Sequence, residues 1–299
     1  MTSPRTPPTV GFTGLGTMGR EMALNLAKAG HRVAAYDVRR EAAEALAPFG
    51  VRPVGSVAEA SRGAGAVITM LPDTPDVEAV VLGEGGLLAH PPEGRLVIDM
   101  STIAPGAVRR MHAALAQAGV ALLDAPVSGG PVGAKNASLS IMVGGEAAAF
   151  EKARPLLAAM GTTLTHVGES GAGQTVKLCN QLVCGINLQA ICEALALGRA
   201  AGVDLQQLRQ VLLGGSAASW MLDKLGPQMI EGDASAGFRI DLMLKDLRLV
   251  AQQAQETNVP LPATALVTTQ YLDARAHGEG GNGNQALFRV YDRMTGQGR

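Results

Sequence analysis

A single lysine stands in a long apolar segment and could carry acid–base chemistry. Lys177 is the only lysine between Lys152 and Lys224, and the residues around it have the pattern of a buried helix. Burial lowers the pKa of an ammonium group, which suits a lysine to general acid–base work near neutral pH. The alternative is a lysine that extends its charged end to solvent. Asn180 and Gln181 follow three and four residues later, so Gln181 shares the helical face of Lys177.

A glycine-rich sequence after a short apolar run has the spacing of a dinucleotide-binding turn. It comprises Gly14, Leu15, Gly16, Thr17, Met18 and Gly19. The first glycine permits a tight bend, the second lets the backbone approach a pyrophosphate, and the third lets helix pack on strand. Asp37 follows at about the 20-residue separation of an acid that binds ribose hydroxyls. We therefore expect NAD as the cofactor, with NADP as the alternative because Arg39 and Arg40 could hold a 2′-phosphate.

Three further segments each follow an expected strand. Ser128-Gly129-Gly130 offers a hydroxyl and unhindered backbone N–H groups that could cradle a carboxylate, although an ordinary glycine turn has the same composition. Leu71-Pro72 and Ser101-Thr102 are the other two. Ligands of open α/β sheets bind outside the carboxyl ends of the strands, so these segments are candidates for a ligand site.

Alternating strands and helices must position these residues. The expected strands are Thr9–Gly14, His31–Asp37, Ala66–Leu71, Leu96–Met100, Ala121–Val127 and Leu139–Val143. Helices are expected over Thr17–Ala29 and Arg40–Ala47. This alternation predicts an α/β domain with a parallel, doubly wound sheet of the Rossmann type.

The pattern changes after about residue 165, where the strand signals cease. Ala/Leu/Gln-rich segments predict an all-α domain whose helices are broken at Gly202, Gly214-Gly215, Gly226-Pro227 and Pro260. We expect an NAD(P)-binding domain over residues 1–168 and a helical domain over residues 169–299. The first helix of the latter is apolar nearly all round, as helices buried on every side are. A second subunit would cover it, so we expect a homodimer or homotetramer.

Composition narrows the classes of partner. The formal net charge is −1, with 25 basic and 26 acidic residues, which gives no general attraction to nucleic acid or to anionic membranes. Cys179, Cys184 and Cys192 have no metal-ligand spacing and are expected to be small buried residues, without disulfide or metal. Met1–Pro8 is expected to be a disordered lead-in without the apolar core of a signal peptide. No transmembrane helix is expected, and the chain is expected in the cytoplasm.

Four segments resemble the β-hydroxyacid dehydrogenases. Gly11–Gly30 resembles the opening signature of that family, Asp124–Gly145 its substrate-binding segment, Gly171–Gln181 its catalytic segment and Lys245–Leu247 its C-terminal cofactor contact. The matches lie in the family's order and cover essentially the whole chain after residue 8. The resemblance implies direct hydride transfer between a nicotinamide and a small β-hydroxy acid or its semialdehyde, without a metal.

The resemblance also implies roles for individual residues. Lys177 would protonate the developing alkoxide during reduction, and Ser128, Gly129 and Gly130 would hold the substrate carboxylate. Near the substrate, the resemblance also implies Thr102, Asn180, Gln181, Phe238 and Asp246. Near the cofactor, it implies Leu71, Pro72, Thr102 and Lys245. Two positions depart from many relatives: Gln181 stands in place of asparagine, and Ala137 in place of glycine.

The substrate is less defined than the reaction. The Asn180-Gln181 pair and Gly237–Leu247 resemble the tartronate semialdehyde reductase branch, which makes D-glycerate from 2-hydroxy-3-oxopropanoate. 3-Hydroxyisobutyrate, glyoxylate, succinic semialdehyde and L-serine remain alternatives, because a pocket discriminates poorly between substrates that differ by one small group. A non-catalytic binding module and an imine reductase are disfavoured, because relatives of both kinds replace the lysine that Lys177 provides.

Overall fold

The computed structural model describes residues 9–296, so the lead-in expected over Met1–Pro8 lies outside the described residues. The chain forms two compact units that meet within one helix, the first ending at Lys177 and the second beginning at Leu178. Each unit has its own apolar core.

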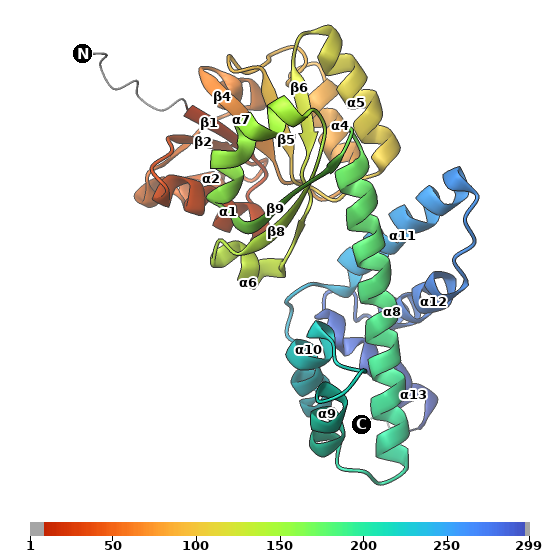
Figure 1. The fold of residues 1–299 in the computed structure, drawn as a ribbon. Helices are drawn as coiled ribbons and strands as arrows, with labels where there is room; N and C mark the ends of the chain where they lie inside the picture. The colour runs from red at the N-terminus through yellow and green to blue at the C-terminus, as the bar shows by residue number, and fades with distance from the viewer. Residues whose placement is uncertain (1–8, 297–299) are drawn as a thin grey trace. The chain divides into compact units, whose positions relative to one another are not determined.

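The first unit is built on a nine-stranded sheet (Figure 1). Its strands are β1 (Thr9–Thr13), β2 (Val33–Tyr36), β3 (Val51–Pro53), β4 (Ala64–Thr69), β5 (Leu96–Asp99), β6 (Ala121–Asp124), β7 (Val127–Ser128), β8 (Leu139–Gly144) and β9 (Gly161–Gly168). The order is β3-β2-β1-β4-β5-β6-β8-β7, with β9 paired to β8. Strand order reverses between β1 and β4, which is where ligands bind in doubly wound sheets.

Helices cover both faces of this sheet (Figure 1). They are α1 (Thr17–Lys28), α2 (Arg40–Glu44), α3 (Val57–Ser61), α4 (Thr74–Leu82), α5 (Pro105–Gln117), α6 (Gly130–Lys135) and α7 (Ala147–Ala158). Val67 and Ile68 are adjacent in β4, point to opposite faces and are both fully buried, one in each apolar cluster. A strand buried on both sides reads as a continuous apolar run, which is why the sequence identified it.

One edge of the sheet differs from the expected parallel arrangement. β8 runs antiparallel to both β6 and β7, and is parallel only to β9. Only ten residues separate Ser128 from Leu139, too few for the crossover of a dozen or more residues that a parallel pair requires. β3 and β9 were not predicted, because β3 is three residues long and most side chains of β9 are not buried.

The second unit is helical. It comprises the greater part of α8 (Ala172–Ala200), followed by α9 (Leu205–Leu213), α10 (Trp220–Glu231), α11 (Ile240–Thr257), α12 (Pro262–Ala276) and α13 (Phe288–Met294). The breaks expected at Gly202, Gly214-Gly215 and Pro260 all lie between helices. The break expected at Gly226-Pro227 is wrong, because α10 continues through Pro227.

Arg209 explains why α10 tolerates an internal proline. Pro227 lacks an N–H, so the carbonyl of Asp223, four residues earlier, has no partner within the helix. The Arg209 guanidinium on α9 donates to that carbonyl at 2.7 Å and to the carbonyl of Leu222 at 3.1 Å. A side chain from a neighbouring helix therefore replaces the missing hydrogen bond.

Helix α8 leaves apolar side chains exposed within the single chain. Val183 is 61% exposed and Leu197 is 72% exposed, and the prediction that a second subunit covers this helix stays a prediction. The expectation for the cysteines holds for Cys192 alone, since Cys179 is exposed and Cys184 half-buried. Among residues 9–296, α8 is the one helix that is long and apolar enough to cross a membrane by length and composition alone, a test that a core helix also passes. Its buried Gln174, Lys177 and Gln181 are polar.

Candidate active site

The glycine-rich turn between β1 and α1 has the geometry of a dinucleotide-binding loop. Gly14 has φ +94°, and a Cβ there would collide with the Met70 carbonyl. A Cβ on Gly19 would collide with the Gly14 carbonyl, whereas one on Gly16 would meet no atom within 4 Å. Of the described side chains, none caps α1, and its first turn carries no acid. The open N–H groups and this space fit the pyrophosphate of a nicotinamide cofactor.

Asp37 holds the same turn from the end of β2. Its Oδ2 accepts the N–H of Leu15 at 2.7 Å, and its Oδ1 accepts the N–H of Arg39 at 2.9 Å. A carboxylate has about four acceptor sites, so these two bonds leave capacity for ribose hydroxyls. The Arg39 guanidinium lies 3.4 Å from Oδ1, and the Arg39 side chain is largely exposed. Asp37 therefore both supports the loop and presents a negative charge beside it.

A buried polar network joins the ends of β4 and β5. Asp99 Oδ1 accepts hydrogen bonds from the hydroxyls of Thr69, at 2.8 Å, and Ser101, at 2.6 Å. The Ser101 hydroxyl in turn accepts the N–H of Leu71 at 2.8 Å. Leu71 and Thr102, both cofactor candidates, are thus carried by one hydrogen-bonded framework. Pro72, next to Leu71, is exposed.

The substrate-carboxylate candidates lie where β7 passes into α6. Ser128 ends β7, and Gly129 and Gly130 have φ +132° and +60°, which favour glycine. The turn is partly exposed. Asn25 of α1 donates to the carbonyl of Ala134 in α6 at 2.6 Å, so the helix that follows the glycine-rich turn also holds the helix after Gly130.

The first two turns of α8 carry the candidate proton-transfer residue. Lys177 is only 6% exposed. The helix begins against β6, where Asp124 accepts the N–H groups of Gly171 and Gln174, each at 2.8 Å. Burial raises the pKa of Asp124 to about 6, although the two N–H donors act in the opposite direction. The structure therefore places Lys177 on a helix whose start is fixed at the carboxyl ends of the strands.

The remaining candidates form a polar cluster within the second unit. The amide of Gln181, 4% exposed, donates to Asp246 Oδ2 at 2.5 Å, and Lys245 Nζ lies 2.8 Å from Asp246 Oδ1. Asp246 is 2% exposed, so it is not the solvated charge pair that such residues commonly form on a helix. Asn180 and Phe238 are half-buried.

Three polar residues with structural roles at this site were missed by the sequence analysis. Asp99, Asp124 and Gln174 are fully buried and connect the strand ends to α8. Asp99 and Asp124 could have been found, because each is an acid that closes an apolar strand, L-V-I-D and A-L-L-D. A buried acid of this kind must have hydrogen-bond donors near it.

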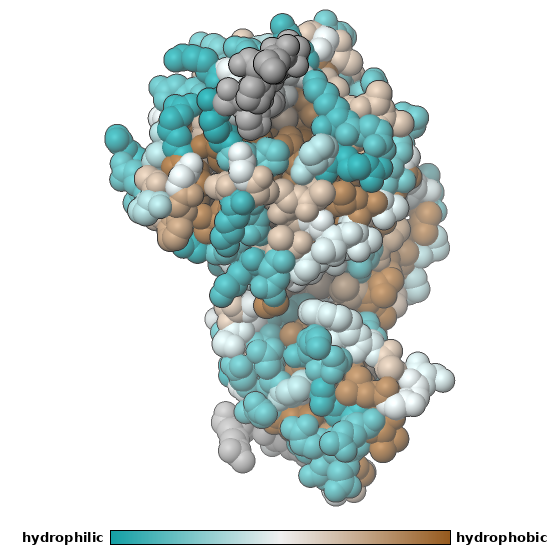
Figure 2. All heavy atoms as spheres, turned by 60° about the vertical axis from the view of Figure 1, so that its left-hand side comes forward, coloured by the Kyte–Doolittle hydropathy of each residue, from teal (hydrophilic) through white to brown (hydrophobic). Residues whose placement is uncertain are grey.

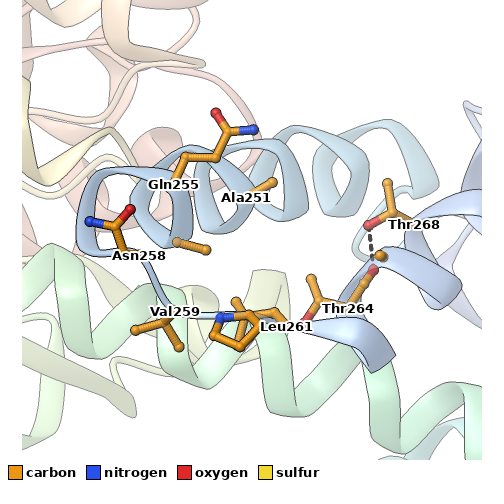
Figure 3. A pocket seen from close by; sticks show the side chains of 10 residues that line it. Ala251, Gln255, Asn258, Val259, Leu261, Thr264 and Thr268 are labelled. Carbon is orange, nitrogen blue, oxygen red and sulfur yellow. Dashed lines mark hydrogen bonds between the residues drawn. The ribbon is translucent and has the colours of Figure 1, made fainter.

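A separate groove lies in the second unit, between the end of α11 and the start of α12 (Figure 3). Its volume is about 720 Å³, and small or apolar side chains such as Ala251, Val259 and Leu261 form much of its wall. Gln255 and Thr264 contribute polar groups. None of the candidate site residues lines it.

Comparisons with known proteins agree with this architecture. Residues 9–168 match the family model for the NAD binding domain of 6-phosphogluconate dehydrogenase, and residues 171–291 match that for NAD-binding of NADP-dependent 3-hydroxyisobutyrate dehydrogenase. The 3-hydroxyisobutyrate dehydrogenase of Pseudomonas aeruginosa is 41% identical, with 95% of this chain and 99% of that protein covered. The chain belongs to the 3-hydroxyisobutyrate dehydrogenase-like family of β-hydroxyacid dehydrogenases.

Other family members show how varied the substrates are. The 2-hydroxy-3-oxopropionate reductase of Escherichia coli is 39% identical, with 96% of this chain and 98% of that protein covered. A solved structure of the Mycobacterium tuberculosis 3-hydroxyisobutyrate dehydrogenase with L-serine has a TM-score of 0.88 and 35% identity, and covers 95% of this chain and 99% of that one. This β-hydroxyacid dehydrogenase is therefore an NAD(P)-dependent oxidoreductase, whose fold and cofactor class agree with the sequence predictions.

Proposed function

We propose that this enzyme reduces tartronate semialdehyde to D-glycerate, with Lys177 as the general acid. The observation that carries the proposal is the burial of Lys177 on α8, directly after a helix start anchored at the ends of the sheet strands. A bound nicotinamide supplies the hydride that reduces the aldehyde carbon. Lys177 Nζ donates a proton to the oxygen of that carbon, so that the product leaves as an alcohol. Ser128 and the backbone of Gly129 and Gly130 hold the carboxylate.

The choice of substrate rests on the polar character of Gln181 and Asp246. Gln181 follows Lys177 by one turn of α8, and its amide is paired with a buried carboxylate. Tartronate semialdehyde has a hydroxyl where the 3-hydroxyisobutyrate skeleton has a methyl group. A site with buried polar groups rejects a ligand that cannot hydrogen-bond to them. The reductase of E. coli, at 39% identity, supports the same assignment.

Asp37 supports NAD as the preferred cofactor. Its carboxylate, held by Leu15 and Arg39, would accept hydrogen bonds from the adenosine ribose and repel a 2′-phosphate. Arg40, one of the two arginines that could bind the 2′-phosphate of NADP, instead forms an ion pair with Glu44 at 2.7 Å.

The experiment is a steady-state assay that compares NADH with NADPH and tartronate semialdehyde with methylmalonate semialdehyde, glyoxylate and succinic semialdehyde. We expect the highest kcat/KM for tartronate semialdehyde with NADH. Lys177→Ala should lower kcat by about 10²–10⁴-fold while NADH binding is retained. Lys28→Ala, an exposed lysine at the end of α1, is the matched control. A Lys177→Ala enzyme with unchanged kcat would refute the role of the lysine.

A second candidate is 3-hydroxyisobutyrate dehydrogenase, favoured by the 41% identity to the P. aeruginosa enzyme. It uses the same proton transfer and the same carboxylate turn. A higher kcat/KM for methylmalonate semialdehyde in the assay above would select it and would leave the role of Lys177 intact.

We also propose that the enzyme is a homo-oligomer, in which a second copy covers the apolar residues exposed on the helical unit. Val183 and Leu197 of α8 and Leu266 of α12 are each more than half exposed. Figure 2 shows apolar side chains at the surface among hydrophilic ones. Light scattering after size-exclusion chromatography should give a dimer or tetramer, and Val183→Glu should shift it toward the monomer. A monomeric wild-type enzyme would refute this proposal.

A further inference from the structure

Gln174, in the first turn of α8, forms hydrogen bonds to the main chain on both sides of Thr102. Gln174 Nε2 donates to the carbonyl of Ser101 at 2.8 Å, and the N–H of Ile103 donates to Gln174 Oε1 at 3.0 Å. Gln174 is fully buried. Because a primary amide offers both a donor and an acceptor, both main-chain groups are satisfied by one side chain. We call this pair of bonds the Gln174 clamp.

Asp124, at the end of β6, also fixes this turn of α8. Its two oxygens take the N–H groups of Gly171 and Gln174, which are among the helix-start donors that have no partner within the helix. Gly173 lies so close to the strands that a Cβ on it would be 2.5 Å from the carbonyl oxygens of Asp124 and Met142. The start of α8 is therefore held by hydrogen bonds and by direct backbone packing.

The clamp continues to the segment expected to contact the cofactor. The main chain of Ser101 is bound by Gln174, while its hydroxyl accepts the N–H of Leu71 and donates to Asp99. A displacement of α8 would therefore be transmitted through Ser101 to the Leu71 segment. The N–H groups at the start of α8 have other acceptors, Asp124 for Gly171 and Gln174 and the carbonyl of Glu169 for Ala172, so the clamp is not needed to satisfy them.

Lys177 lies three residues after Gln174, a spacing that places two side chains on one face of a helix. We propose that Gln174 is a positioning residue that fixes the proton-donating Lys177 relative to the Thr102 segment, with Asp124 holding the helix in place. This inference rests on the proposed role of Lys177 as the general acid. A misplacement of about 1 Å in a reacting group can cost about 10²-fold in rate, so loss of the clamp should affect kcat strongly.

The test is Gln174→Glu, which keeps the size and the acceptor but loses the donor to Ser101. Thr175→Ala is the control, because Thr175 is exposed at the next position of α8 and its hydroxyl donates to the carbonyl of Gly171 at 2.9 Å. We expect Gln174→Glu to lower kcat by roughly 10–100-fold, with KM changed much less. Its solvent deuterium isotope effect should rise, because proton transfer becomes limiting. Thr175→Ala should behave as wild type.

A double-mutant cycle separates positioning from general damage to the fold. In a Lys177→Ala background, measured by single turnover, Gln174→Glu should lower the residual rate by less than about threefold, because its effect acts through the lysine. An equal loss in both backgrounds, or a Gln174→Glu enzyme as active as Thr175→Ala, would overturn the inference while the role of Lys177 stands. Wild-type turnover by Lys177→Ala would overturn both. If Gln174→Glu does not fold, as judged by circular dichroism, Gln174→Met is read by the same criteria.

Discussion

Asp124 should make the stability of the enzyme depend on pH in a direction opposite to that of most carboxylates. Its side chain is fully buried, and burial raises its pKa to about 6, above the usual value of 3.8. The nearby charge of Asp99 adds to this rise, while the N–H groups of Gly171 and Gln174 oppose it. A carboxyl with a raised pKa stabilises the fold below its unfolded pKa, and this contribution is lost as the pH rises through the folded value.

The size of the effect follows from these two pKa values. At about 1.4 kcal/mol per pKa unit, the full contribution is about 3 kcal/mol. About 2 kcal/mol of it falls between about pH 7.5 and about pH 4.5. Asp124→Asn keeps the shape but cannot titrate, so the free energy of unfolding of wild type minus that of the variant should rise by about 2 kcal/mol as the pH falls over this range.

The assay is urea unfolding of both proteins at several pH values, followed by circular dichroism. Trp220, the only tryptophan, lies in the second unit and reports unfolding there, so its fluorescence distinguishes the two units. The amide introduced by Asp124→Asn places a donor against an N–H, which costs stability equally at every pH. A difference between the proteins that stays constant with pH, or that falls as the pH is lowered, would refute the reasoning.

Three further predictions concern the backbone and the cofactor loop. Gly173→Ala should destabilise the enzyme by about 1–3 kcal/mol and lower kcat, since its Cβ would collide with two strand carbonyls; wild-type thermal stability would contradict this. Ala137→Gly should stabilise it by up to about 1 kcal/mol in urea unfolding, because Ala137 has φ +53°, and a loss of stability would argue against strain there. Asp37→Ala should weaken NADH binding about tenfold in a fluorescence titration, with a smaller change for NADPH. An unchanged ratio of the two affinities would remove the argument for NAD.

The sequence predicted the parts of the fold that have periodic or fixed-spacing signals. The glycine-rich turn, the doubly buried strand around Val67 and the helix that carries Lys177 all have such signals. The antiparallel edge around β8 was not predicted, because pairing direction depends on the length of the connection and not on side-chain pattern. The continuity of α10 was missed for a related reason, since the hydrogen bonds that compensate for Pro227 come from Arg209 on another helix.

In the candidate site, too, residues with a sequence signal could be predicted, whereas contacts between distant segments could not. Gly14, Asp37 and Lys177 could be named from residue type and spacing, and the departure at Ala137 led to a residue with positive φ. The contacts of Gln174 could not be anticipated, because Gln174 and Ser101 are 73 residues apart and meet only in the folded chain. The roles of the site residues in substrate binding stay predictions.

The main-chain hydrogen bonds of Gln174 affect how enzymes of this kind could evolve new substrate specificity. The clamp uses the carbonyl of residue 101 and the N–H of residue 103, which almost any amino acid provides. The identity of residue 102 can therefore change while the main-chain grip is kept. In directed evolution toward another hydroxy acid, position 102 should accept many substitutions, whereas position 174 should accept almost none. Substrate selectivity would thus depend on position 102 and the rate of proton transfer on position 174. Because the two positions are neighbours in the fold but serve different properties, position 102 could change during evolution while position 174 is conserved.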